Sequence, residues 1–305
     1  MLRCAPFGIS VAAVVLCLGC SGSVDPFVAI DSGDQVFASS VGSIKDLEAR
    51  GEGGMTPLLF AAQRGRTLSL ELLLDRGAKI DARDAAGFTA LHLAAQRGHA
   101  GCAKALLDRG AGPELEAGPR KVRPLHLAVQ RGDRDTVALL LSRGADVNAK
   151  TSWGETSLMM LARGGPESLF EALVRPNLDW NAVDLRSYTA LHIAADADND
   201  AFIRRWSAEG HSLDPVTLTG ATPLDIALQN RRDRAAQFLF DRGAGVVLAE
   251  DVPPPLVVAA RDDDVGSLLW LLASGADVTK TFDDETALAV ATRCGSLGAM
   301  KILGR

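Results

Sequence analysis

The five histidines are the residues best suited to catalysis or metal binding. Three of them, His92, His126 and His192, close the same short motif, and the other two are His99 and His211. A helical zinc site needs two histidines four residues apart with a carboxylate beside them, and none of the five has such a neighbour. We therefore expect structural roles for these imidazoles and predict no metal site and no cofactor.

The sharpest acidic run is Asp262-Asp263-Asp264, which we expect to form a solvated turn and a helix start, where carboxylates suit the helix dipole. The sequence holds no glycine-rich phosphate loop, no Gly-x-Ser-x-Gly elbow and no cysteine–histidine nucleophile motif. We therefore predict that the protein is not an enzyme and takes no small-molecule substrate. An enzyme whose site is dispersed over the fold stays an alternative.

The N-terminus has the pattern of an export signal. Residues 7–18 are nearly all apolar, the length of a signal-peptide core and too short to span a bilayer. Gly19-Cys20 follows and resembles the lipoprotein box of bacteria, although Cys17 stands where leucine is usual. The resemblance implies a signal peptide over residues 1–19, a lipidated Cys20 and a tether over residues 20–33.

This resemblance also implies a location. The mature protein would be lipid-anchored in the cell envelope and face the periplasm, and Ser21 after the cysteine would favour the outer membrane. Secretion is the second choice. A scaffold that is neither exported nor lipidated, in the cytosol or anchored by its apolar N-terminus, stays an alternative.

A sequence repeat that occurs eight times would form the helices that position any site. Its openings lie at steps of 33, 34, 33, 33, 33, 32 and 32 residues, beginning at Thr56, Thr89, Arg123, Thr156, Thr189, Thr222, Pro254 and Thr286. Threonine caps a helix and proline suits its first position, so each opening predicts a helix start. A Gly-Ala pair that would end a second helix recurs at Gly77, Gly110, Gly144, Gly243 and Gly275.

These residues resemble the ankyrin repeat, whose opening is Thr-Pro-Leu-His-x-Ala. The resemblance implies an all-α solenoid of helix-turn-helix units with hairpin-like loops, over residues 34–305, with about eight repeats and a partial N-terminal cap. Stacking of neighbouring units would supply the core. It further implies that the motif histidines bond to neighbouring turns, and that loops and first helices line a concave binding face.

The expected binding face has a basic row. Successive units carry Gln63-Arg64, Gln96-Arg97 and Gln130-Arg131 before the inter-helix turn, which would place Arg64, Arg97 and Arg131 in line. Duplication of a helix-favouring surface pair explains this row as well as an acidic protein partner does. The row is also the one feature that favours nucleic-acid binding, which 32 basic against 38 acidic residues, a net charge of −6, otherwise argues against.

Aromatic residues at the loops are the other candidate anchors. Phe88 and Tyr188 directly precede an opening threonine, and Trp153 lies in a neighbouring loop. Exposed aromatic side chains are typical anchors for a protein partner, although packing between loops accounts for Trp153 equally well. The sequence therefore predicts a non-catalytic module that binds a partner protein, with protection against a toxin or support of an envelope protein as roles that fit.

Overall fold

The computed structural model describes residues 24–244, 254–273 and 276–304 of the 305-residue chain. It divides into two compact units, unit 1 (Met1–Ser152) and unit 2 (Trp153–Arg305). The described residues form nine helix pairs, which confirms the all-α repeat fold that the sequence predicts. The predicted Cys20 and the signal peptide over residues 1–19 lie outside the described residues.

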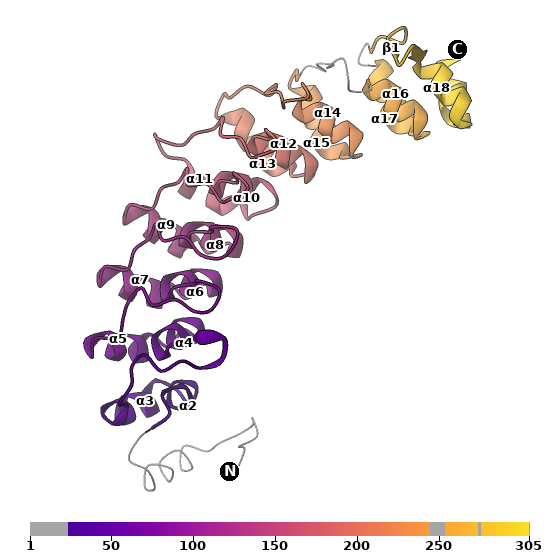
Figure 1. The fold of residues 1–305 in the computed structure, drawn as a ribbon. Coiled ribbons are helices and arrows are strands. Elements are labelled where there is room, and N and C mark those ends of the chain that lie inside the picture. The colour runs from indigo at the N-terminus through magenta and orange to yellow at the C-terminus, as the bar shows by residue number, and fades with distance from the viewer. Residues whose placement is uncertain (1–23, 245–253, 274–275, 305) are drawn as a thin grey trace. The chain divides into compact units, whose positions relative to one another are not determined.

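Unit 1 contains four helix pairs, in which first helices pack on first helices and second helices on second (Figure 1). Its elements are α2 (Pro26–Asp31), α3 (Asp34–Ser40), η1 (Val41–Ser43), η2 (Glu52–Gly54), α4 (Pro57–Arg64), α5 (Thr67–Asp75), α6 (Ala90–Arg97), α7 (Ala100–Asp108), α8 (Pro124–Arg131) and α9 (Arg134–Ser142).

Unit 2 contains five helix pairs and a two-stranded antiparallel hairpin. Its elements are α10 (Ser157–Ala162), η3 (Glu167–Leu169), α11 (Phe170–Leu173), α12 (Ala190–Asp196), α13 (Asp200–Ala208), α14 (Pro223–Gln229), α15 (Asp233–Asp241), α16 (Pro255–Arg261), α17 (Val265–Ala273), β1 (Thr281–Phe282), β2 (Glu285–Thr286), α18 (Ala287–Cys294) and α19 (Leu297–Leu303).

The predicted openings do start the first helices. Thr56, Thr156, Thr222 and Thr286 each accept a hydrogen bond from a backbone amide in the first turn of the following helix. Such a cap satisfies a donor that the helix itself leaves unpaired. The second helices then bury a leucine row, whose fully buried members include Leu73, Leu106, Leu140 and Leu239.

The predicted tether over residues 20–33 is wrong for its described part. Residues 26–31 form α2, which packs on α3 and α4 and buries Ala29 and Ile30. Asp25 caps this helix, because its side chain accepts the amide of Phe27, and the Phe27 ring meets Phe60 edge-on at 5.6 Å. The first repeat therefore has both helices, whereas the sequence predicted a shortened cap beginning at Asp34.

The fourth of the predicted repeats is irregular, because its second helix shortens to η3 and α11. Aromatic rings fill the space. Phe170 contacts Phe202 and Trp180, with ring centroids 5.5 and 5.9 Å apart, and Trp180 meets Trp206 at 5.2 Å. His211 stacks on Trp180 at 4.1 Å, which gives this histidine a packing role in unit 2.

Candidate functional site

The three arginines of the basic row occupy the same structural position. Arg64, Arg97 and Arg131 are the last residues of α4, α6 and α8, which are neighbouring first helices of unit 1. All three side chains are exposed. Each helix ends there because the next residue is a left-handed glycine; Gly98 after α6 has φ +74°. The structure therefore aligns the row as the sequence predicts.

The three arginines of the basic row differ from one another in their ion pairing. Arg64 lies 3.3 Å from the carboxylate of Asp31 on α2 and packs over the Phe60 ring. Arg97 and Arg131 make no ion pair with any described residue. The Arg131 side chain runs beside Gly98, where an added Cβ would lie 3.5 Å from its Nε and 3.6 Å from a carboxylate oxygen of Asp133. Two cations are thus presented to solvent.

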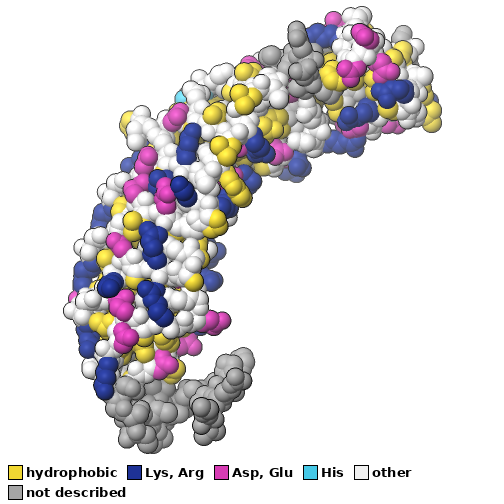
Figure 2. Space-filling view, in the orientation of Figure 1, with side chains coloured by type: hydrophobic (Ala, Val, Ile, Leu, Met, Phe, Trp, Pro, Cys, Tyr) yellow, Lys and Arg dark blue, Asp and Glu magenta, His cyan; other side chains and the backbone are white. Residues whose placement is uncertain are grey.

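A second arginine row holds the repeats together. Arg109 pairs with Asp75 at 2.7 Å and Arg143 pairs with Asp108 at 2.6 Å, so the end of each second helix is bonded to the end of the one before. Sequence analysis missed this pairing row, although the 34- and 35-residue spacing of its partners was visible in the repeats. Figure 2 shows basic and acidic side chains interspersed over the face of unit 1 that it displays.

Arginines of the loops have structural roles as well. Arg50 and Arg83 each donate from Nη1 to a carbonyl of their own turn and to a carbonyl one loop further on. Arg123 pairs with Glu114 and Glu116 at 3.2 and 3.1 Å. These bonds stabilise the loops, so Arg97 and Arg131 differ from the loop arginines in having no partner among the described residues.

The three aromatic candidates have different surroundings. Phe88 of unit 1 is half-buried and meets the His92 ring edge-on at 5.7 Å. Tyr188 of unit 2 is also half-buried, between His192 and the Arg186 guanidinium, which lies 4.3 Å from its ring centroid. Trp153 is 53% exposed and offers the largest aromatic surface of the three. Their role in binding a partner stays a prediction.

The motif histidines are structural, as the resemblance implied. Nδ1 of His92 accepts the amide of Thr89, so its Nε2 carries the proton and donates to the Val122 carbonyl of the next loop at 3.2 Å. His192 repeats this arrangement with Thr189 and Ala221. Burial lowers the pKa of both imidazoles to about 4. The hydrogen bonds to the Val122 and Ala221 carbonyls favour the charged form and oppose this shift, but burial has the larger effect.

The acidic run is also used within the fold. Asp264 caps α17 by accepting a hydrogen bond from the amide of Ser267, and Asp263 accepts one from the amide of Ala299 on the next second helix. Asp262 pairs with Arg231 and Arg261.

No group of three or more candidate metal ligands occurs among the described residues. Within the same residues, no helix is long and apolar enough to cross a membrane.

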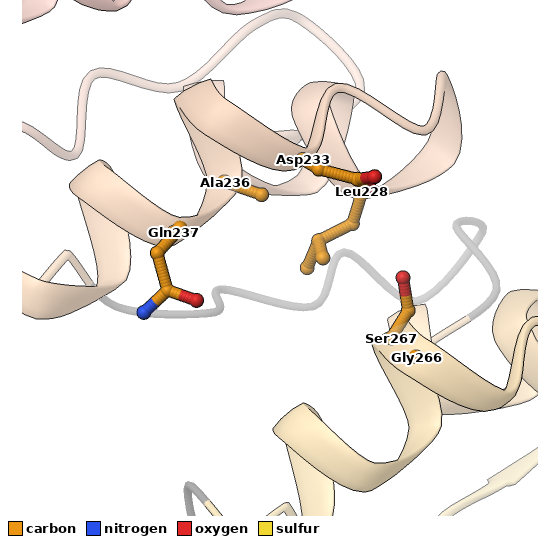
Figure 3. Close-up of a pocket in the computed structure, with 6 residues that line it drawn as sticks. All are labelled: Leu228, Asp233, Ala236, Gln237, Gly266 and Ser267. Atoms are coloured by element: carbon orange, nitrogen blue, oxygen red, sulfur yellow. The ribbon is translucent and has the colours of Figure 1, made fainter.

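A small pocket lies between α15 and α17. Figure 3 shows Leu228 entering it from α14, with Asp233, Ala236 and Gln237 on one side and Gly266 and Ser267 on the other. Its volume is about 160 Å³. The Ser267 hydroxyl bonds to Asp264 at 2.6 Å and the Gln237 amide bonds to Asp241 at 2.8 Å. These groups are engaged in capping and pairing, so the pocket presents no assembled catalytic set.

Comparison with known proteins decides the family. A family model described as ankyrin repeats in three copies matches residues 27–117, 85–151, 125–206 and 158–250, which together are more than half of the chain. This chain belongs to the ankyrin-repeat family. It is also similar to Rabankyrin-5 of Mus musculus and of Homo sapiens, each 27% identical over 151 residues. These alignments cover 47% of this chain but only 13% of each relative.

Ankyrin repeats form protein-interaction surfaces, and this membership therefore gives the chain a protein-binding role. Proteins built of ankyrin repeats are typically scaffolds without catalytic activity. The family fixes the backbone, and the surface side chains determine which partner is bound.

Proposed function

We propose that this ankyrin-repeat protein binds an acidic surface of a partner protein through Arg97 and Arg131 at the ends of α6 and α8. One observation carries the proposal. The arginines of the pairing row and of the loops are bonded to neighbouring repeats, whereas these two are exposed and unpaired among the described residues.

The arrangement suits recognition of carboxylates. A guanidinium presents five donors in a planar fork that matches a carboxylate, and both arginines stand on helix ends fixed by packing. Exposed cations speed the encounter with an acidic partner at low salt. Arg64 has a smaller part in this proposal, since Asp31 already neutralises it.

The test is a crosslinked pull-down from cells with the full-length chain, read by mass spectrometry. The wild type is compared with Arg97→Glu/Arg131→Glu and with a charge-matched control, Lys79→Glu/Arg134→Glu, whose side chains are also exposed. We expect one partner to be captured by the wild type and the control and lost in the Arg97/Arg131 variant. Far-ultraviolet circular dichroism checks that both variants fold.

Unchanged capture by the Arg97/Arg131 variant would contradict the assigned surface. The loops around Trp153, Tyr188 and Phe88 would then be the next surfaces to change. Loss of the partner in both variants would show that overall charge, and not these two positions, determines binding. A salt titration supports the proposal if affinity falls steeply with ionic strength in the wild type only.

We further propose that the protein is an exported lipoprotein, anchored by Cys20 and facing the periplasm, whose partner is an envelope protein or an incoming toxin. The apolar residues 7–18 and Gly19-Cys20 support this proposal. Mass spectrometry of the mature N-terminus tests it: an acylated Cys20 is expected, and Cys20→Ser should abolish membrane association. Recovery of the intact N-terminus in the cytosolic fraction would support the non-exported scaffold instead.

A further inference from the structure

An open hollow on unit 2 gathers three arginines. It lies against the second helices α13 and α15, has a volume of about 560 Å³, and is lined by Asp200, Arg204, Arg234, Gln237, Phe238, Asp241 and Arg242. Neither the ankyrin fold nor the partner surface proposed above requires three guanidinium groups at one place. Their pairing within the hollow therefore decides whether they are free to act.

The pairing row is interrupted at this hollow. Arg242 follows the last residue of α15 just as Arg109 and Arg143 follow the last residues of α7 and α9. Those two arginines pair with an aspartate that ends the preceding second helix. At the corresponding end of α13 stands Ala208, so Arg242 bonds instead to the neutral hydroxyl of Ser207 at 3.3 Å. Its charge is left without the carboxylate that the row supplies elsewhere.

A buried ring holds two of the cations in place. Phe238 is only 7% exposed, and the guanidinium carbons of Arg204 and Arg242 lie 4.6 and 4.8 Å from its ring centroid. Cation–π contact fixes the planes of both groups while their edges stay available for hydrogen bonds. Arg204 also pairs with Asp200 through Nε at 3.3 Å, which leaves its terminal nitrogens unbonded among the described residues.

The remaining charges leave the hollow positive. Arg234 is exposed and has no ion pair with a described residue. Asp241 accepts from the Gln237 amide at 2.8 Å and Asp200 is engaged by Arg204, so three cations face two carboxylates. A carboxylate ligand is planar and is satisfied by one fork, whereas a tetrahedral dianion accepts hydrogen bonds from several directions.

We propose that this hollow binds a phosphate group, with Arg234 and Arg242 as its principal ligands and Arg204 as the third. The group can be a soluble phosphate ester or the phosphate of a lipid headgroup, since the chemistry that the arginines recognise is the same. The site is independent of the partner surface on unit 1, because it uses different helices and different residues.

The probe is inorganic phosphate, titrated calorimetrically into the full-length protein at constant ionic strength, with acetate as the carboxylate comparison. The test variant is Arg234→Gln/Arg242→Gln, and the matched control is Lys79→Gln/Arg134→Gln, which removes the same charge from exposed positions of unit 1. We expect the test variant to weaken phosphate binding at least tenfold and the control to leave it unchanged. Acetate should bind at least tenfold more weakly than phosphate.

Flotation with vesicles separates the two sources. Binding to phosphatidylcholine vesicles that contain phosphatidic acid, lost in Arg234→Gln/Arg242→Gln, would assign a lipid headgroup. Phosphate binding without vesicle binding would assign a soluble ester, and both results support the site. Equal binding of phosphate by wild type and test variant, no binding of phosphate at all, or equal affinity for acetate would overturn it. Circular dichroism confirms that the variants are folded.

Discussion

Acidification should destabilise this protein through two buried histidines before most carboxylates titrate. His92 and His192 are both inaccessible to solvent and have their pKa lowered from 6.5 to about 4, chiefly by burial. The unfolded chain therefore binds more protons than the folded one between these values. Stability from each histidine is fully present above about pH 6.5 and is lost as the pH falls toward 4.

The size of the effect follows from the shift. A difference of about 2.5 units corresponds to about 3 kcal/mol for each histidine when fully expressed, because one unit is about 1.4 kcal/mol. At pH 5, about 2 kcal/mol of this is already lost. The loss is local to the repeats concerned, because in such arrays each repeat contacts only its neighbours.

The variant His92→Met provides the comparison, because Met159 fills the same position in another repeat, where its Sδ accepts the Thr156 amide at 3.5 Å. Hydrogen exchange, followed by mass spectrometry on peptides of α6 and α8 at pH 7.5 and 5, measures the local opening free energy. We expect wild type to lose about 2 kcal/mol over this range and the variant to lose almost none. His192→Met should behave alike on α12. Equal pH dependence in wild type and variant would refute the argument.

Three variants test other features of the fold. Asp225 is buried with one carboxylate oxygen unpaired among the described residues, and burial raises its pKa, so Asp225→Asn should stabilise by about 1 kcal/mol in urea unfolding. The gain should be larger at pH 7 than at pH 4, because the protonated aspartic acid is already neutral. Ser187 has φ +62°, where Gly87 stands in another repeat, so Ser187→Gly should raise the free energy of unfolding by about 0.5–1 kcal/mol. Arg109→Gln/Arg143→Gln should lower thermal stability by about 1 kcal/mol at low salt and by nearly nothing in 1 M NaCl.

The repeat fold was predictable because its signals are local and recur. A threonine cap, a first-turn proline and a terminal glycine each act within one turn, so the openings at Thr56 to Thr286 mark helix starts wherever they occur. The first repeat escaped this search because Asp25-Pro26-Phe27 replaces the usual opening. Its place in the fold depends on tertiary contacts, namely the Phe27–Phe60 pair and the close approach of Phe27 to Gly51.

The site was predicted only in part, because exposure and pairing are set between repeats. Sequence analysis placed Arg97 and Arg131 on one row, but it could not weigh Phe88 or Tyr188, whose rings are half-buried against His92 and His192. The two ring contacts, Phe88–His92 and Tyr188–His192, each join residues four positions apart. The orientation of each ring pair depends on the neighbouring loop, to which the histidine is bonded. A short sequence spacing therefore indicates proximity without showing which face of a ring remains free.

Pairing across one repeat explains why chemically similar arginines have different roles here. Arg109 and Arg143 have an aspartate 34 or 35 residues earlier, at the end of the preceding second helix, and both are paired. At the equivalent distance before Arg97 and before Arg242 stand Ala62-Gln63 and Ser207-Ala208, and neither pair offers a carboxylate. The repeat geometry brings these positions together whatever side chains they carry, so an arginine that ends a helix forms this ion pair only where the residue one repeat earlier is acidic. This relation distinguishes Arg97, on the proposed partner surface of unit 1, and Arg242, in the proposed phosphate site of unit 2, from the pairing row.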